Sequence, residues 1–198
     1  MSSSNFVSRG GDKLKAALDQ FQVDVNGKVV LDVGSSTGGF VDCLLQNGAS
    51  KVYAVDTAYG EFAWKLRNDP RVAVMERTNI LHLEELPEEA EGPERSRRVD
   101  LITIDAGWTK LELVLPVVKK FLKEDGMIIA LLKPHYESSK QDLIKGVLSL
   151  EKSEEIKDQT VKKIQELGFK IQEEMESPIL GGAGNKEFLL LILLLKEN

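Results

Sequence analysis

The sequence predicts an α/β fold built on a mostly parallel sheet. Short apolar runs alternate with segments of helical periodicity along the whole chain, which is the pattern of a sheet covered by helices. The first apolar run leads directly into a glycine-rich turn, VVLDVGSSTGGF over residues 29–40. Polar residues stand where several of the expected strands end, the edge at which open α/β sheets bind ligands. With 198 residues and 42% hydrophobic composition, the chain can build one well-buried domain.

The first half of the chain predicts a helix and then three strand–helix units. Apolar residues recur at helical spacing in Leu14, Ala17, Leu18 and Phe21, so a short amphipathic helix comes before the sheet. The first strand covers 29–32, and the helix after the turn ends at an Asn-Gly pair, 47–48, that suits a left-handed cap. The second strand covers 51–56 and the third 72–75. Between them a helix at 61–68 stops before a proline and is expected to bury Trp64.

The second half predicts four more strands. Residues 87–96 are acidic and contain Pro and Gly, so we expect a surface loop. The fourth strand covers 99–105 and is followed by a helix to about residue 122, and the fifth covers 127–133 and stops at a proline. A helix at 154–167 turns its apolar residues inward, Leu167 among them. The last strands, 169–176 and 186–195, are joined by the turn-rich segment SPILGGAGN.

Composition and charge disfavour several classes of protein. The amino-terminal residues lack the apolar core of a signal peptide, and the longest apolar run, 188–195, is far shorter than the roughly 20 residues of a membrane helix. The single cysteine, Cys43, excludes an internal disulfide or a multi-cysteine metal site. We therefore expect a cytoplasmic protein without metal. The net charge of −6 argues against non-specific nucleic-acid binding, but a local basic face stays open, with candidates Arg9, Lys15, Lys65, Arg67, Lys140 and Lys186.

The glycine-rich turn predicts a cofactor site, because bare backbone and a helix amino terminus can both face a ligand there. Its glycines do not fit the dinucleotide pattern G-x-G-x-x-G, and the chain contains no P-loop. The turn resembles instead the first motif of S-adenosylmethionine-dependent methyltransferases, acid-x-Gly-x-x-x-Gly-Gly. This resemblance implies S-adenosylmethionine as cofactor, held around Asp32, Gly34, Ser35, Thr37, Gly38 and Gly39.

Further cofactor contacts are expected at the ends of the next strands. Asp56 ends the second strand, about 20 residues after the turn, where such units place an acid on the ribose hydroxyls. Thr57 follows it. Thr78 and Asn79 follow the third strand and could bracket the adenine. Each of these could equally be a turn or helix-cap residue.

The fourth strand ends in Asp105 and the fifth in Lys133, so a carboxylate and an ammonium group are expected side by side. A lysine held in this way can take the proton of an alcohol as its oxygen attacks a methyl group. Asp105 also borders the expected cofactor site.

Five segments make a family resemblance specific. They are SRGGDKLKAAL, LDVGSSTGGFVDCLLQNGASKVYAVD, YGEFAWKLRNDPRV, LLKPHYE and SPILGGAGNKEFLLLI. Together they resemble the hemolysin A (TlyA) branch of the FtsJ-like RNA methyltransferases, over nearly the whole chain. The resemblance implies a Rossmann-like, seven-stranded methyltransferase sheet with helices on both faces. It also implies a domain at 23–198 that follows a helical extension, 1–22, carrying SRGGDKL.

The same resemblance implies a catalytic tetrad of Lys13, Asp105, Lys133 and Glu187 that methylates a ribose 2′-hydroxyl, with ribosomal RNA or a ribosomal subunit as partner. Lys133 would act as the base, Asp105 would orient it, and Lys13 and Glu187 would position the ribose. The branch usually carries an S4 domain before SRGG, where only MSSSNFV stands here, so RNA capture is expected to be weaker.

The chain also departs from the family pattern close to the expected catalytic pair. After Asp105 the family's Val-Ser-Phe-Ile-Ser is replaced by AGWTK, residues 106–110. Aromatic side chains near these strand ends, Trp108, His135 and Tyr136, could stack on an unstacked base.

Other functions remain open. The chain could methylate a small molecule or a protein, although the tetrad argues against this. The turn typical of adenine amino-methylating enzymes is absent, and Cys43 lies in a helix rather than where a cytosine C5 nucleophile would be. A non-catalytic cofactor-binding role or a hemolysin-like role is the third possibility, although no basic amphipathic helix supports lysis. The sequence leaves the target nucleotide and the oligomeric state open.

Overall fold

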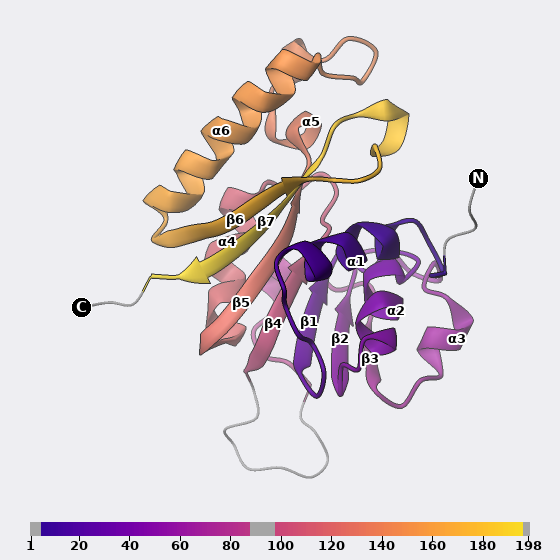
Figure 1. Cartoon of the computed structure of the whole chain (residues 1–198). Helices are drawn as coiled ribbons and strands as arrows, with labels where there is room; N and C mark the ends of the chain where they lie inside the picture. The colour runs from indigo at the N-terminus through magenta and orange to yellow at the C-terminus, as the bar shows by residue number, and fades with distance from the viewer. Residues whose placement is uncertain (1–4, 88–97, 196–198) are drawn as a thin grey trace.

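A computed structural model describes residues 5–87 and 98–195 and contains one seven-stranded sheet, ordered β3-β2-β1-β4-β5-β7-β6 (Figure 1). The strands are β1 (Val29–Val33), β2 (Lys51–Val55), β3 (Val72–Met75), β4 (Val99–Ile104), β5 (Leu122–Leu132), β6 (Phe169–Glu176) and β7 (Phe188–Leu194). Neighbours from β3 to β5 pair in parallel, whereas β7 runs antiparallel between β5 and β6. The predicted mostly parallel α/β fold is confirmed. The loop expected at 87–96 lies, apart from Pro87, outside the described residues.

Helices cover both faces of this sheet. They are α1 (Gly10–Gln20), α2 (Gly39–Gln46), α3 (Trp64–Arg67), α4 (Leu111–Val118), α5 (Pro134–Glu137) and α6 (Leu150–Glu166), with 3-10 turns η1 (Ile80–His82), η3 (Lys119–Phe121), η4 (Lys140–Asp142) and η5 (Gly182–Gly184). Successive side chains of a strand point to opposite faces. In β1, Val30 therefore packs with α1 and α2, whereas Leu31 packs with α4 and α6. Two apolar cores, one on each face, hold the strand ends in place.

Two expected core positions are wrong. Trp64 is 75% exposed, because α3 is a single turn whose buried contacts come from Phe62 and Leu66 instead. Leu167 is 42% exposed, because it is the residue after the last turn of α6 and no longer follows the helical periodicity. The strand β5 also begins earlier than expected, at Leu122, since the preceding helix ends sooner.

The first turn of α1 lies against the first turn of α2, and glycine makes this close approach possible. A Cβ on Gly39 would overlap the Ser8 hydroxyl and crowd the backbone of α1 at Gly11. The leucines of α1, Leu14 and Leu18, are buried in the same core as α2. This packing carries Lys13 to the carboxyl end of the sheet, next to the glycine-rich turn.

Candidate active site

The carboxyl ends of β1, β2, β4 and β5 surround a cleft of about 380 Å³, within the size range of small-molecule sites. Seven of the predicted cofactor and catalytic residues line it, namely Gly34, Asp56, Thr57, Thr78, Asn79, Asp105 and Lys133, and so does Trp108, which was predicted to stack on a base. Other lining residues were not predicted, among them Glu61, Ile80, Ala106, Gly107 and Thr109. Most of these directly follow the strand ends, and that position was the only sequence signal available for them.

Gly34 lets two strand ends meet at the floor of the cleft. Its φ is +85°, and a Cβ would lie 2.6 Å from the carbonyl oxygen of Asp105. A side chain is therefore excluded on both conformational and steric grounds. Asp56 braces the same turn, because its Oδ2 accepts the N–H of Ser36 at 2.7 Å and its Oδ1 accepts that of Ala58 at 2.8 Å. The turn and the acid are thus held rigidly beside bare backbone.

A second, smaller hollow of about 230 Å³ adjoins the cleft. The predicted residues Ser35, Thr37 and Gly39 line it together with Arg9 and Lys13. Gly34 and Asp105 border both spaces. The two hollows therefore meet at these two residues.

Two predicted cofactor residues lie beneath the turn rather than in either hollow. Asp32 is fully buried and accepts the hydroxyl of Thr103 at 2.6 Å. Burial raises the pKa of Asp32 to about 7, against the opposing effect of that hydrogen bond. Gly38 is covered by Phe62 and Leu66. These two residues support the turn from below. The contribution of Thr103 was not predicted, because a polar residue inside an apolar strand has no distinctive sequence signal.

The four predicted catalytic side chains form two ion pairs. Lys13 Nζ lies 2.5 Å from Glu187 Oε2, and Lys133 Nζ lies 2.5 Å from Asp105 Oδ1. The first pair is buried, with Lys13 8% and Glu187 2% exposed. The second is partly open to the cleft, with the side chains of Lys133 and Asp105 16% and 22% exposed. Residues from α1, β4, β5 and β7 are thus brought together at one end of the sheet.

His135 lies near both lysines. Burial lowers the pKa of its imidazole, and the charges of Lys133 and Lys13 lower it further, so the ring is neutral at physiological pH. Its ring centroid is 4.2 Å from that of Tyr136, which lies 4.9 Å from that of Trp108. Trp108 is 85% exposed and has a φ of +66°, a conformation that costs a bulky residue energy. The cleft therefore carries an aromatic rim with one face open to solvent.

Glu137 was not predicted as a site residue. Its Oε1 accepts the N–H of Leu111 at 2.9 Å, at the first turn of α4, and burial raises the pKa of its carboxyl. Glu137 ends α5, which begins directly after Lys133, and Leu111 follows the loop that carries Asp105. The contact therefore ties the loop that carries Asp105 to the segment that follows Lys133.

The six cations proposed to contact RNA do not form one free basic face. Four of them are in ion pairs: Lys15 with Asp19, Lys65 with Asp42, Arg67 with Glu76, and Lys186 with Glu154 and Glu176. Arg9 and Lys140 form no ion pair with any residue in 5–87 or 98–195. Arg9 lines the smaller hollow and is the candidate that lies next to the tetrad.

The described residues also bear on metal binding, thiol reactivity and membrane insertion. Within the described residues, no group of three or more His, Cys, Asp or Glu side chains is arranged to hold a metal ion. Burial raises the pKa of the Cys43 thiol to about 12, so it stays protonated and unreactive. None of the helices in the described part of the chain combines the length and apolarity that a membrane crossing requires.

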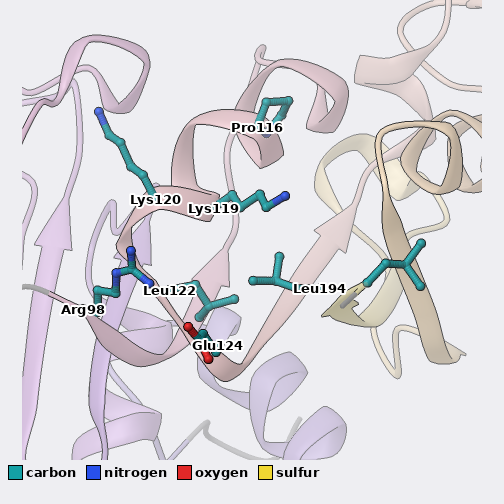
Figure 2. Close-up of a pocket in the computed structure, with 8 residues that line it drawn as sticks. Arg98, Pro116, Lys119, Lys120, Leu122, Glu124 and Leu194 are labelled. Atoms are coloured by element: carbon teal, nitrogen blue, oxygen red, sulfur yellow. The ribbon is translucent and has the colours of Figure 1, made fainter. Parts of the chain in front are cut away.

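A larger hollow of about 790 Å³ lies at the opposite end of the sheet, near the start of β5 and the end of β7 (Figure 2). Its lining is a mixture of exposed charged residues and apolar side chains: Arg98, Pro116, Lys119, Lys120, Leu122, Glu124, Leu194 and Leu195. It contains none of the predicted site residues. If the site were chosen by cavity volume alone, it would be placed at the end of the sheet that lacks the four predicted catalytic residues.

A parallel sheet closed by one antiparallel strand, with a glycine-rich turn after β1 and an acid after β2, defines the class of Rossmann-like methyltransferases. Within this class, the chain belongs to the FtsJ-like methyltransferase family, whose model matches residues 6–192.

Two relatives are similar in sequence to this protein over most of its length. "Putative rRNA methyltransferase YqxC" of Bacillus subtilis is 41% identical over 93% of this chain and 64% of its own length. "16S/23S rRNA (cytidine-2'-O)-methyltransferase TlyA" of Mycobacterium tuberculosis is 40% identical over 93% and 67%. The chain therefore spans about two thirds of the length of these relatives.

A solved structure has the same fold. The structure of "a putative hemolysin from Lactococcus lactis" matches with a TM-score of 0.88 and 40% identity, covering 96% of this chain and 89% of that one. The predicted resemblance to the hemolysin A branch is confirmed. The roles of the individual site residues, and the division of the chain at residue 22, stay predictions.

Proposed function

We propose that this protein is an S-adenosylmethionine-dependent methyltransferase that methylates the 2′-hydroxyl of a ribose in ribosomal RNA. The observation that carries the proposal is the meeting of Lys13, Asp105, Lys133 and Glu187 as two ion pairs beside a nucleotide-sized cleft. The names of the relatives support RNA as the substrate, and that of TlyA specifies a cytidine. A ribosomal substrate implies that the protein works in the cytoplasm.

The residues that line the cleft fit the proposed cofactor. Bare backbone at Gly34 faces the space where the methionine part would lie, and the fixed carboxylate of Asp56 suits a pair of ribose hydroxyls. Thr78 and Asn79 offer hydroxyl and amide groups to an adenine edge. S-adenosylmethionine, when bound, supplies a methyl group on a sulfonium that is electrophilic without help from a metal.

The tetrad provides the remaining chemistry. Lys133 must first release one proton from its ammonium group to solvent. As a neutral amine it takes up the proton of the 2′-hydroxyl while the oxygen attacks, and Asp105 stabilises the ammonium group that results. Lys13 and Glu187, which are buried as a pair beside the smaller hollow, position the ribose. Because the hydroxyl and the methyl group react in line, holding them in place is the main source of acceleration.

The aromatic rim suits a substrate base that has been rotated out of a stack. Trp108 presents an exposed ring beside Asp105, and Tyr136 supports it from behind. Stacking between a base and an aromatic side chain is worth about 1–3 kcal/mol. Arg9, at the mouth of the smaller hollow, is placed to contact a neighbouring phosphate.

The test combines calorimetry with methyl transfer. S-adenosylmethionine and S-adenosylhomocysteine are titrated into the purified chain, and transfer of labelled methyl is then measured on ribosomal subunits and on naked ribosomal RNA. Lys133→Ala should abolish transfer and leave cofactor binding intact. Lys119→Ala, which removes an exposed cation at the opposite end of the sheet, is the matched control and should change neither.

The outcomes separate the candidate functions. Label that is recovered as a 2′-O-methylated nucleoside, and lost in Lys133→Ala, establishes the proposed reaction. Cofactor binding with transfer to a protein or a small molecule instead of RNA would replace the substrate. No cofactor binding at all would rule out methyl transfer altogether.

A further inference from the structure

One buried amide side chain, that of Asn185, holds the chain just before Glu187. Asn185 is 2% exposed. Its Oδ1 accepts the N–H of Leu148 at 3.1 Å, and its Nδ2 donates to the carbonyls of Gly146 at 3.0 Å and Gly182 at 3.3 Å. Both hydrogens of the amide group and its oxygen are therefore used. The side chain has one orientation and links two segments that are distant in sequence, residues 146–148 and the loop at 182–185.

Asn185 also fixes the loop that forms one wall of the smaller hollow. Its main-chain carbonyl accepts the N–H of Gly181 at 2.8 Å, and Gly181 and Gly182 line the hollow together with Lys13. A Cβ on Gly181 would overlap the carboxylate of Glu187. The loop backbone therefore lies directly against the acid that pairs with Lys13.

Through these contacts the buried amide of Asn185 is connected to Glu187 and Lys13, the groups assigned to the reaction. Asn185 fastens residues 181–184 to the turn at 144–147, which is itself closed by a bridge between Ile144 and Val147. The loop limits where the carboxylate of Glu187 can lie, and that carboxylate holds Lys13. Asn185 itself lines neither hollow, so it can act only through the residues that it places.

We propose that Asn185 is a positioning residue for methyl transfer, which sets the geometry of the Lys13–Glu187 pair by locking the 181–184 loop in place. The inference rests on the proposed function, because that function assigns Lys13 and Glu187 to the reaction. Small displacements of groups that position a substrate cost large factors in rate.

The first test replaces Asn185 with an isostere. Asn185→Asp keeps the acceptor but turns the donor group into an oxygen that faces two carbonyls, so the loop should be released. We expect kcat to fall by about 10- to 100-fold, with the Kd for S-adenosylmethionine unchanged within about twofold. Asn47→Asp makes the same chemical change at the far end of α2, where Asn47 Nδ2 donates to the carbonyl of Cys43 at 2.7 Å. This control should retain wild-type kcat even if its Tm falls.

A second variant tests the same geometry without changing the amide. Gly181→Ala adds a methyl group against the Glu187 carboxylate, and it should reduce kcat in the same way if the loop governs the pair. Equal kcat in wild type, Asn185→Asp and Gly181→Ala would overturn the proposal and leave Asn185 with a purely structural role.

A structural measurement keeps this inference separate from the proposed function. In a crystal structure of Asn185→Asp, we expect residues 181–184 to shift and the contact between Lys13 and Glu187 to open. An unchanged loop and ion pair would refute the positioning role. If the wild-type protein transfers no methyl group to RNA, the proposed function fails, but this crystallographic comparison still decides what Asn185 does.

Discussion

The buried carboxyl of Asp32 leads to a prediction about stability and pH. Asp32 is fully buried, and its Oδ2 has no hydrogen-bond partner among the described residues. Its pKa is raised from 3.8 to about 7, so between these values the native state holds a proton that the unfolded state has lost. Native stability must therefore fall as pH rises through this window. At about 1.4 kcal/mol per pKa unit, the full loss is about 4 kcal/mol by pH 8.

Asp32→Asn removes this pH dependence, because an amide does not titrate. Its NH₂ group would be buried without an acceptor, at a pH-independent cost of about 1–3 kcal/mol. We therefore expect the variant to be less stable than wild type near pH 4 and more stable near pH 8, by about 1–3 kcal/mol each way. The comparison reverses sign between pH 3.8 and about 7, the range in which the unfolded chain has lost the proton and the native protein still holds it.

Urea unfolding followed by circular dichroism at several pH values measures both free energies directly. The difference between variant and wild type isolates Asp32 from the other acids. Asp125→Asn, at an exposed acid near the start of β5, is the control and should give a constant difference. A constant difference for Asp32→Asn as well would show that Asp32 is ionised in the native protein, and the reasoning from burial would be wrong.

Two further predictions concern the rim and the α1–α2 contact. Trp108→Ala should weaken RNA binding by about 10- to 100-fold through lost stacking, with the cofactor Kd unchanged; equal RNA affinity in a filter-binding assay would exclude Trp108 from the substrate site. Gly39→Ala should lower the free energy of unfolding by about 1–3 kcal/mol, because the added methyl group overlaps Ser8. Gly182→Ala provides the comparison, since nothing lies within 4 Å of a Cβ there and its φ is not positive, and an equal loss in both variants would mean that α1 does not press on Gly39.

Much of the sheet and its functional edge could be predicted because the physical signals are local. Apolar runs bounded by turns mark buried strands, and the acids Asp56 and Asp105 follow two of them directly. Once the strands are parallel, their carboxyl ends must meet at one edge. The residues around the cleft therefore follow from strand order alone, without knowledge of any side-chain contact.

The contacts that hold the site together could not be predicted in this way. Thr103 beneath Asp32, Glu137 on the first turn of α4 and Asn185 behind Glu187 are each defined by a partner far along the chain. Single polar residues in apolar or turn-rich segments have no periodicity that marks them. Trp64 was wrongly expected in the core because helical spacing was counted across a segment that forms only one turn.

The position of β7 has a consequence for how the protein is made. This last strand lies between β5 and β6, so β6 has no place in the sheet until β7 has been synthesised. The same strand begins next to Glu187, whose partner Lys13 lies 174 positions earlier in the chain. Before residues 187–194 have been synthesised, the chain has neither a closed sheet nor the Lys13–Glu187 pair. Sheet closure and completion of the tetrad both await this final strand, and pairing across so long a stretch of chain is among the slower steps of folding. If the tetrad acts as proposed, the nascent protein cannot methylate RNA before β7 has been synthesised.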